Sequence, residues 1–316
     1  MLRSALLYLS DQPRVFHFVR HNTLAKRFAH RFVAGETLDE AITAVRGLNA
    51  RRIRASLDLL GESVTNEREA RATRDAYIEI LDRIHAEGLD ANVSLKLTAM
   101  GLDVSEDLCV GLMHDVLARA RDCGSFVRID MESSEYTERT LHLFEHRFYP
   151  LYREHVGVVL QSYLYRTFSD VEYAIKLGCR VRLCKGAYKE PATVAFAEKK
   201  DVDASYVKGM HALLRHANYP ALATHDPRII AEAKRFAREN DIAPSRFEFQ
   251  MLYGIRRDLQ ERLVAEGYNM RVYVPFGTQW YPYLMRRLAE RPANVAFITG
   301  NVLREMVGRT NHRGAP

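Results

Sequence analysis

Eight short apolar segments, spread along most of the chain, each end in a polar or charged residue. The segments are RIRASLDLLGE, NVSLKLT, SFVRIDME, VGVVLQS, CRVRLCKGAY, ALATHD, RFEFQMLYG and MRVYVPFG. Charged stretches with helical periodicity separate them. Strands that alternate eight times with helices predict an α/β fold, a (β/α)8 barrel of the TIM type.

The predicted strands lie near residues 53–60, 93–98, 126–131, 156–160, 180–184, 221–224, 247–251 and 272–274. Gly35, followed by Thr37 and Glu40, indicates a helix stop and then a capping box that begins the next helix. A further helix is expected over residues 138–148, with Pro150 ending it.

The 316 residues accommodate a barrel of roughly 250 residues and an N-terminal extension. We expect extra helices over residues 1–36, packed on a barrel of residues 37–316. The extension is basic and its apolar residues recur at helical spacing. Two alternatives stay open for it, a face that contacts a membrane peripherally and a transit peptide.

Composition excludes several classes of protein. No apolar run approaches the roughly 20 residues that cross a bilayer. The four cysteines form no C-x-x-C pair, so we expect neither a metal site nor a disulfide framework. The net charge of +6 is spread along the chain without a basic block, which indicates solvated surfaces and no nucleic-acid partner.

The ends of the predicted strands carry the first candidates for chemistry, because barrel enzymes place their active sites there. These residues are Asp58, Lys96, Asp130, Gln161, Arg182, His225, Gln250 and Tyr273. Strand alternation points Lys96 and Asp130 into the barrel, and we expect them to form an ion pair. A purely structural ion pair is the alternative. The further polar residues at the same end favour a functional site.

Two other segments suit anionic ligands. After the last strand, Tyr283, Arg286 and Arg287 share one side of a predicted helix, where two arginines can grip a carboxylate. A solvated basic helix face is the alternative. After the fifth strand, Gly186 lets the backbone approach a ligand and Lys185 suits a phosphate. There is neither a P-loop nor a G-x-G-x-x-G motif.

The chain resembles the proline dehydrogenase family, above all its short monofunctional bacterial members, and the flavoprotein domain of proline utilisation A. The motifs that carry the resemblance are SLKLT at 94–98, RIDME at 128–132, LQSYLYRT at 160–167, RLCKGAYKEP at 182–191, ATHD at 223–226, FQMLYG at 249–254 and YLMRRLAE at 283–290. They cover nearly the whole chain from about Gly35. One departure is Cys184, where the family usually has an aliphatic residue.

The resemblance implies a distorted barrel that binds FAD non-covalently. It implies oxidation of L-proline to Δ1-pyrroline-5-carboxylate, by hydride transfer from proline C5 to flavin N5, as the first step of proline catabolism to glutamate. Electrons would pass to a membrane quinone. The product would pass to a separate pyrroline-5-carboxylate dehydrogenase, with transient contact as an open question. The implied location is the cytoplasm, with peripheral contact to the inner face of the membrane left open.

The resemblance also implies roles for individual residues. The catalytic positions would be Asp130 and Arg182, and Asp130 would serve either as a base or as a structural partner. The substrate would contact Lys96, Leu183, Tyr273, Tyr283, Arg286 and Arg287. FAD would contact Met131, Gln161, Lys185, Gly186, Ala187, Thr224, His225 and Gln250.

Two competing hypotheses remain at this point. One is a flavin barrel for another substrate, such as a relative of methylenetetrahydrofolate reductase. The paired arginines argue against it, because a folate enzyme needs a large aromatic slot and a nicotinamide donor. The other is a basic, non-enzymatic barrel that binds polyanions or membranes and holds no cofactor.

Overall fold

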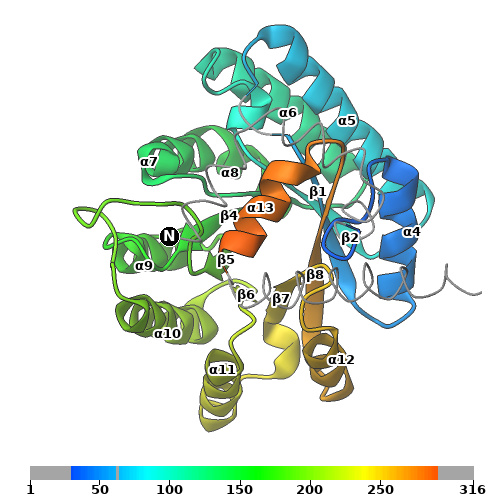
Figure 1. Ribbon diagram of the computed structural model, residues 1–316. Coiled ribbons are helices and arrows are strands. Elements are labelled where there is room, and N and C mark those ends of the chain that lie inside the picture. Colours follow the sequence, from blue (N-terminus) through cyan, green and yellow to red (C-terminus); the bar gives the residue numbers. More distant parts are fainter. Residues whose placement is uncertain (1–29, 62–63, 291–316) are drawn as a thin grey trace, which may run out of the picture. The chain divides into compact units, whose positions relative to one another are not determined.

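Eight parallel strands close into one barrel, in the order in which they occur along the chain (Figure 1). The structure, a computed structural model, describes residues 30–61 and 64–290, with side chains as far as residue 285. The strands are β1 (Arg54–Leu59), β2 (Ala91–Leu95), β3 (Val127–Ile129), β4 (Val156–Gln161), β5 (Arg180–Cys184), β6 (Ala221–Ala223), β7 (Glu248–Leu252) and β8 (Asn269–Phe276). The predicted fold class and its eightfold barrel are confirmed.

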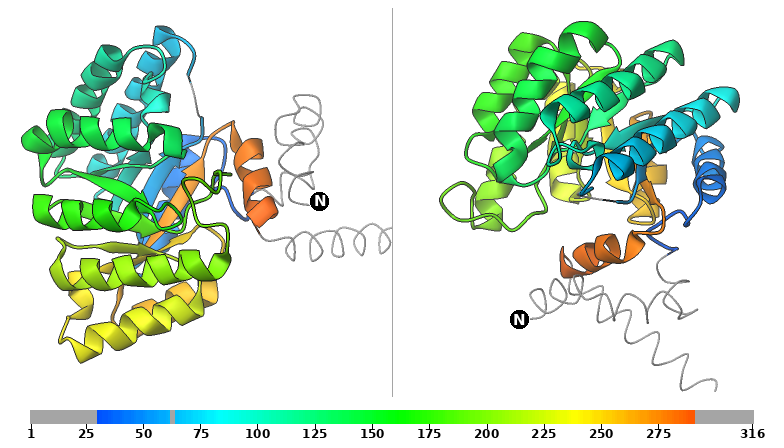
Figure 2. Two further views of the ribbon diagram at one scale, coloured as in Figure 1. Left: turned by 90° about the vertical axis from the view of Figure 1, so that its left-hand side faces the viewer. Right: turned by 90° about the horizontal axis from the view of Figure 1, so that it is seen from above.

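Helices form a layer outside the strands, as the two views of Figure 2 show. They are α4 (Leu38–Asn49), α5 (Glu67–Ala86), α6 (Glu106–Asp122), α7 (Ser134–Leu143), α8 (Tyr149–Tyr152), α9 (Thr167–Leu177), α10 (Lys199–His216), α11 (Pro227–Glu239) and α12 (Arg257–Ala265). Short turns η1 (Thr98–Met100), η2 (Phe144–Phe148) and η3 (Pro244–Arg246) complete the connections. Every βα loop therefore opens at the same end of the barrel.

The chain divides into two compact units. Phe32–Thr278 forms the barrel and the helices α4 to α12. The second unit combines Met1–Arg31 with Gln279–Pro316, and its described part contains helix α13 (Trp280–Glu290). Residues 1–29 and 291–316 lie outside the described residues, so the division at residue 36 stays a prediction.

The start of α4 confirms the predicted capping box. The Thr37 side chain accepts from the Glu40 backbone, and the Glu40 carboxylate accepts from the backbone of Glu36 and Thr37. Gly35 has φ +128°, and a Cβ there would lie 2.4 Å from Glu40. The capping box therefore needs glycine at this position.

The helix after β3 is longer than expected. Pro150 does not end it, because the helical segment continues through η2 and α8 to Tyr152. The η2 segment is a π-helix, in which the Tyr149 backbone donates to Phe144 five residues earlier. This wider turn shifts the hydrogen-bond register just before the proline, which lacks the donor that an α-helix would use.

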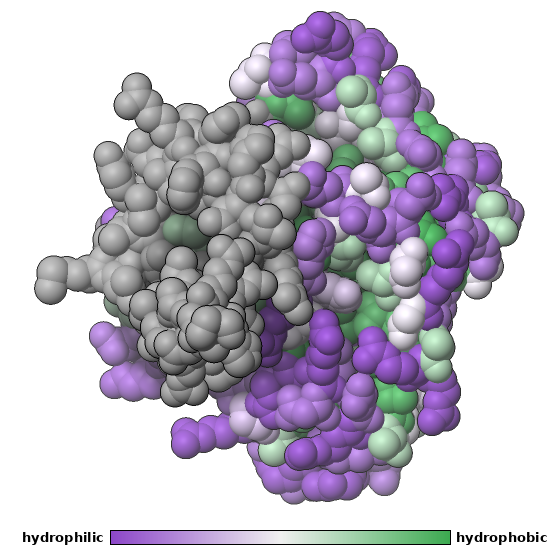
Figure 3. All heavy atoms as spheres, turned by 45° about the vertical axis from the view of Figure 1, so that its right-hand side comes forward, coloured by the Kyte–Doolittle hydropathy of each residue, from purple (hydrophilic) through white to green (hydrophobic). Residues whose placement is uncertain are grey.

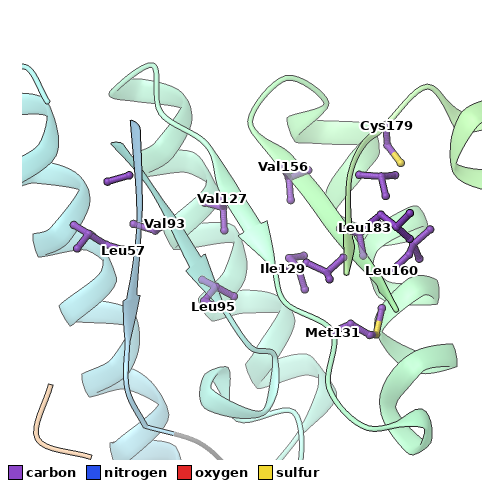
Figure 4. Packing of buried hydrophobic residues seen from close by; sticks show 14 of the residues in the cluster. Leu57, Val93, Leu95, Val127, Ile129, Met131, Val156, Leu160, Cys179 and Leu183 are labelled. Carbon is purple, nitrogen blue, oxygen red and sulfur yellow. The ribbon is translucent and has the colours of Figure 1, made fainter. Parts of the chain in front are cut away.

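Apolar side chains on the outer face of the strands pack against the helices. Figure 4 shows this layer along β1 to β5, with Leu57, Val93, Leu95, Val127 and Ile129 among its members. All five are fully buried, and each contributes roughly 1.5–3 kcal/mol to folding. The described surface in Figure 3 is mainly hydrophilic, with apolar residues scattered over it.

The barrel interior is unusually polar. Most TIM-type barrels fill this space with branched apolar side chains. Here the buried residues include several that the sequence pattern points inward, namely Ser56, Ser94, Arg128, Arg182, Glu248, Gln250 and Arg271. Buried polar groups lower stability unless they are paired, so this interior is built for more than packing.

Candidate active site

Asp130 is the centre of a buried polar cluster where the strands end. One carboxylate oxygen accepts a hydrogen bond from Nη1 of Arg182 at 2.6 Å, and the other accepts from Oη of Tyr273 at 2.8 Å. Arg182 also donates to Oγ of Ser94 at 2.9 Å, and its guanidinium lies 5.3 Å from the centre of the Tyr273 ring. One carboxylate therefore joins β5 and β8 to the segment after β3.

The side chains of this cluster are buried. The side chains of Arg182 and Asp130 are only 7% and 11% exposed, so each charge depends on the other for compensation. Burial raises the pKa of Tyr273 well above its ordinary value, and the nearby Asp130 carboxylate raises it further. The Tyr273 hydroxyl therefore keeps its proton and acts as a donor.

Lys96 has a different partner from the expected one. Its Nζ lies 4.0 Å from Oδ1 of Asp58, whereas the described hydrogen bonds of Asp130 go to other groups. The predicted Lys96–Asp130 pair was wrong. Strand register does not explain the difference, because Leu95 pairs with Ile129, which places the next residues, Lys96 and Asp130, side by side. The Asp130 carboxylate is instead bonded by Arg182 and Tyr273, which reach it from β5 and β8. Asp58 is thus a residue of the site for which the family motifs suggested no role.

Two buried polar atoms in the cluster are left without a partner among the described residues. Gln161 donates through Nε2 to the Met131 carbonyl at 3.2 Å, but its Oε1 accepts nothing. The Nε of Arg182 likewise donates to no described group. Unsatisfied buried polar atoms lower stability, so an acceptor and a donor here fit a bound polar molecule. Other buried atoms of the described residues, such as Nε of Arg128 and of Arg180, are unpartnered too, so it is the position at the strand ends that makes these two atoms candidates for a ligand.

The loop after β5 approaches the same end of the barrel. Gly186 has φ +102°, and a Cβ there would lie 2.4 Å from the Tyr163 ring. Only glycine allows this combination of backbone and contact. Ala187 follows it and is exposed. The backbone of this segment is therefore held close to the ring while its next residue faces outward.

Lys185 is committed to carboxylates. Its Nζ lies 2.5 Å from Oδ1 of Asp203 and 3.3 Å from Oδ2 of Asp226. Both acids line an open surface groove of about 730 Å³ between α10, from Lys199 to His211, and the start of α11. The lysine predicted to contact a cofactor thus stands at the edge of a groove of ligand size.

The residues predicted after β6 and on β7 form hydrogen bonds with nearby residues. Oγ1 of Thr224 accepts from the Asp226 backbone at 3.1 Å. Nε2 of His225 accepts from the Leu252 backbone at 2.9 Å, which requires the tautomer protonated at Nδ1. Gln250 donates to Glu248 at 2.5 Å inside the barrel. These contacts hold the loop after β6 against β7.

Leu183 does not point into the barrel. It is fully buried, and a Cβ added to Gly209 of α10 would lie 3.5 Å from its methyl group. Alternation along β5 explains this placement, because the neighbouring Arg182 occupies the interior. The contact of Leu183 with a substrate stays a prediction.

The remaining predicted residues lie in α13. Tyr283, Arg286 and Arg287 are one helical turn apart or adjacent, as the sequence predicted. They belong to the second unit, and the side chains of the two arginines lie outside the described residues. Their role stays a prediction.

Two carboxylates near the site went unpredicted. Glu132 is buried and accepts from Oγ1 of Thr98 at 2.7 Å. Glu190, in the loop after β5, accepts from the backbone of Ser134 at 2.8 Å. Both lie within family motifs, RIDME and RLCKGAYKEP, but neither is the polar residue that ends a predicted strand, so strand periodicity does not mark them.

Neither a cluster of metal ligands nor a membrane-spanning helix is found in the described part of the chain. Within residues 30–61 and 64–290, no three His, Cys, Asp or Glu side chains gather as metal ligands. In the same part of the chain, no helix has both the length and the apolar character that crossing a membrane requires.

Comparison with known proteins decides the family. The model of the proline dehydrogenase family matches residues 41–300. The chain belongs to the proline dehydrogenase family. It is 42% identical to proline dehydrogenase of Deinococcus radiodurans, over 96% of this chain and 98% of that protein. It is 41% identical to proline dehydrogenase 1 of Bacillus subtilis, over 96% of this chain and all of that protein.

A solved structure supports the assignment. The crystal structure of proline utilization A from Bdellovibrio bacteriovorus, inactivated by N-propargylglycine, superposes with a TM-score of 0.80 at 27% identity. The match covers 88% of this chain, which spans about a third of that protein (34%). The chain is therefore an oxidoreductase of the proline dehydrogenase family with the family's barrel.

Proposed function

We propose that the protein oxidises L-proline to Δ1-pyrroline-5-carboxylate with FAD as cofactor, and that electrons then pass to a membrane quinone. The observation that carries the proposal is the pair of unsatisfied buried atoms, Gln161 Oε1 and Arg182 Nε, in a barrel of this family. Gln161 Oε1 can accept a hydrogen bond and Arg182 Nε can donate one, so together they suit a ligand that carries both a donor and an acceptor. FAD presents both and, when bound, supplies the acceptor for the hydride that proline loses.

Residues from several strand ends would hold the cofactor. Arg182 and Gln161 would meet its polar edge, with Met131 beside them. Gly186 leaves its backbone accessible between Lys185 and Ala187. Thr224, His225 and Gln250 stand after or within the next two strands, in the family's FAD-contacting motifs.

Proline would be recognised through its carboxylate. Lys96, Arg286 and Arg287 supply cations for it, and Tyr273 and Tyr283 would shape the pocket around the ring. Fixing the substrate by its carboxylate orients the carbon that is oxidised, which lowers the entropic part of the barrier. The proline nitrogen loses a proton in the same overall reaction.

Asp130 is better suited to positioning than to proton transfer. Both of its oxygens already accept hydrogen bonds, from Arg182 and from the protonated Tyr273. A base needs an oxygen that can reach the substrate proton. Asp130 therefore orients one cofactor-facing cation and one substrate-facing hydroxyl.

The cellular setting belongs to the same proposal. The enzyme would work in the cytoplasm and reach quinone at the inner face of the membrane, with residues 1–36 as the segment to test for membrane contact. Its product would be consumed by a separate pyrroline-5-carboxylate dehydrogenase. Neither step calls for a nucleic-acid partner.

One spectrum tests the reaction. We expect the purified protein to show the visible absorption of oxidised flavin, and anaerobic L-proline to bleach it. A flavin that proline leaves unchanged would refute the substrate. A colourless protein that FAD cannot reconstitute would refute the enzyme itself.

The carboxylate clamp has its own test. Arg286→Ala should raise KM for proline by orders of magnitude while FAD stays bound, because only the substrate loses a cation. Arg262→Ala, which removes an exposed arginine from α12, is the matched control. An unchanged KM in Arg286→Ala would remove the clamp.

A further inference from the structure

Glu190 lies in the middle of the loop between β5 and α10 and joins three strand-end loops. Its Oε1 accepts from the Ser134 backbone at 2.8 Å and from the Tyr163 hydroxyl at 3.2 Å. Its Oε2 accepts from the Ser134 hydroxyl. Ser134 follows the loop after β3, and Tyr163 belongs to the loop after β4. One carboxylate therefore ties the loops after β3, β4 and β5 together.

The contact at Ser134 replaces a missing helix cap. Ser133, at the N-cap position of α7, makes no side-chain capping bond. Glu190 fills that role from 56 residues away. A carboxylate at a helix N-terminus is favoured by the exposed N–H groups and by the helix dipole. The attachment of the loop to α7 is thus specific in both geometry and charge.

The contact at Tyr163 leads toward the proposed cofactor segment. The Tyr163 ring lies against Gly186, where an added Cβ would come within 2.4 Å of it. The Tyr163 backbone also donates to the Lys185 carbonyl at 2.9 Å. The hydrogen bond from the Tyr163 hydroxyl therefore fixes the ring and backbone of Tyr163, against which Lys185 and Gly186 pack.

The rest of the loop is fastened to the same neighbour. The Phe196 backbone donates to Tyr163 at 2.8 Å, and the Tyr165 backbone donates to Val194 at 3.0 Å. The rings of Tyr165 and Phe196 pack edge to face. These bonds secure the second half of the loop, whereas Glu190 secures the first half beside Lys185 and Gly186.

We propose that Glu190 is a positioning residue for the cofactor, acting through Tyr163 to hold the backbone of Lys185, Gly186 and Ala187 in its binding conformation. The inference rests on the proposed FAD-dependent function. It does not place Glu190 on the substrate. The side chain touches none of the residues proposed for the proline carboxylate among those the structure describes.

The test compares Glu190→Ala with Glu190→Gln in the full chain. Alanine removes all three bonds, so we expect FAD titrated into the apoprotein to bind about tenfold more weakly or worse. Glutamine keeps Oε1 for Ser134 and Tyr163 and offers Nε2 to the Ser134 hydroxyl, so it should restore most of the affinity. At saturating FAD, KM for proline should stay close to that of the wild type in both variants.

Two further measurements guard the interpretation. Tyr163→Phe keeps the ring and removes only the hydroxyl, so it should weaken FAD binding in the same direction even if Glu190→Ala folds poorly. Hydrogen exchange of the apoprotein should speed up around Tyr163 and Gly186 in Glu190→Ala. Glu172→Gln, an exposed carboxylate on α9 that makes no described bond, is the charge-matched control for both readouts.

The outcomes separate this inference from the proposed function. If the wild type binds FAD and both Glu190→Ala and Tyr163→Phe bind it equally well, the inference is overturned and the function stands. If unfolding temperature falls but FAD affinity is unchanged, Glu190 is merely structural. If the wild type binds no FAD at all, the proposed function fails, and this inference fails with it.

Discussion

Asp130→Asn is the sharpest perturbation of the buried cluster. Asparagine preserves the shape of the side chain but removes the charge that compensates Arg182, and its amide can accept from only one of the two donors, Arg182 or Tyr273. The affected side chains are 7% and 11% exposed, so water offers little replacement. The change therefore tests how much the Asp130–Arg182 ion pair contributes to the free energy of unfolding.

The structure sets the expected magnitude. Removing one partner of a buried ion pair lowers stability by about 3–5 kcal/mol. Asparagine retains one acceptor, so we expect the lower end of that range, about 3 kcal/mol. For a domain of this size, that corresponds to a fall in Tm of roughly 6–12 °C. Tyr273→Phe, which leaves the Asp130–Arg182 bond in place, should lower stability by only about 1 kcal/mol.

Urea unfolding of the apoprotein is the assay, because it excludes any contribution from bound FAD. Adding Arg182→Met to Asp130→Asn should recover part of the loss, since no uncompensated cation is then buried. A free energy of unfolding for Asp130→Asn alone within about 0.5 kcal/mol of the wild-type value would refute the reasoning. In kinetics, a positioning role predicts a lower rate with an unshifted pH profile, whereas loss of a base would remove one limb of that profile.

Two further predictions concern the loop after β5 and the floor of the barrel. Gly186→Ala should lower stability by about 2 kcal/mol or more and reduce FAD uptake, because it combines positive φ with a clash against Tyr163. The control is Gly111→Ala, in a helix with open space around the glycine. Equal urea midpoints for Gly186→Ala and the wild type would contradict the prediction. Burial alone would raise the pKa of Glu248, but the Arg271 guanidinium bonded to it lowers the pKa below 4.5. The unfolded chain then binds the proton more tightly, so this stabilisation is complete above about pH 4.5 and is lost as the pH falls through the lower folded-state value. Glu248→Gln should remove that part of the pH dependence of stability. If the free energy of unfolding falls equally steeply with pH in the variant and in the wild type, Glu248 makes no such contribution.

The strand-by-strand pattern was readable because it depends on local physics. A strand buried on its outer face must alternate, so Val127 and Ile129 faced the helices and Arg128 the interior, as the sequence indicated. The capping box at Thr37 and Glu40 was equally local and is confirmed. The prediction that Pro150 ends its helix was wrong, because a proline breaks a regular α-helix but is tolerated directly after a π-helical turn.

The pairing of charges was not readable in the same way. Lys96 and Asp130 both pointed inward on neighbouring strands, yet Lys96 lies near Asp58 and Asp130 binds Arg182. Which ions meet depends on the side chains that reach across the closed barrel from other strands, as Arg182 and Tyr273 do, and a linear pattern does not encode this. Glu190 is the extreme case, because its partners lie 27 and 56 residues away.

The sequence by itself determined the architecture, the family and the side chains that gather at one end of the barrel. Those follow from periodicity and from motifs, which are properties of neighbouring residues. Only the tertiary structure decided that Asp130 holds Arg182 and Tyr273 and that Leu183 faces α10. It also decided that Gln161 and Arg182 each keep one buried atom without a partner among the described residues. Hydrogen-bond partners are chosen over distances of a few ångströms in space, and the closing of the barrel brings together residues that the chain keeps far apart.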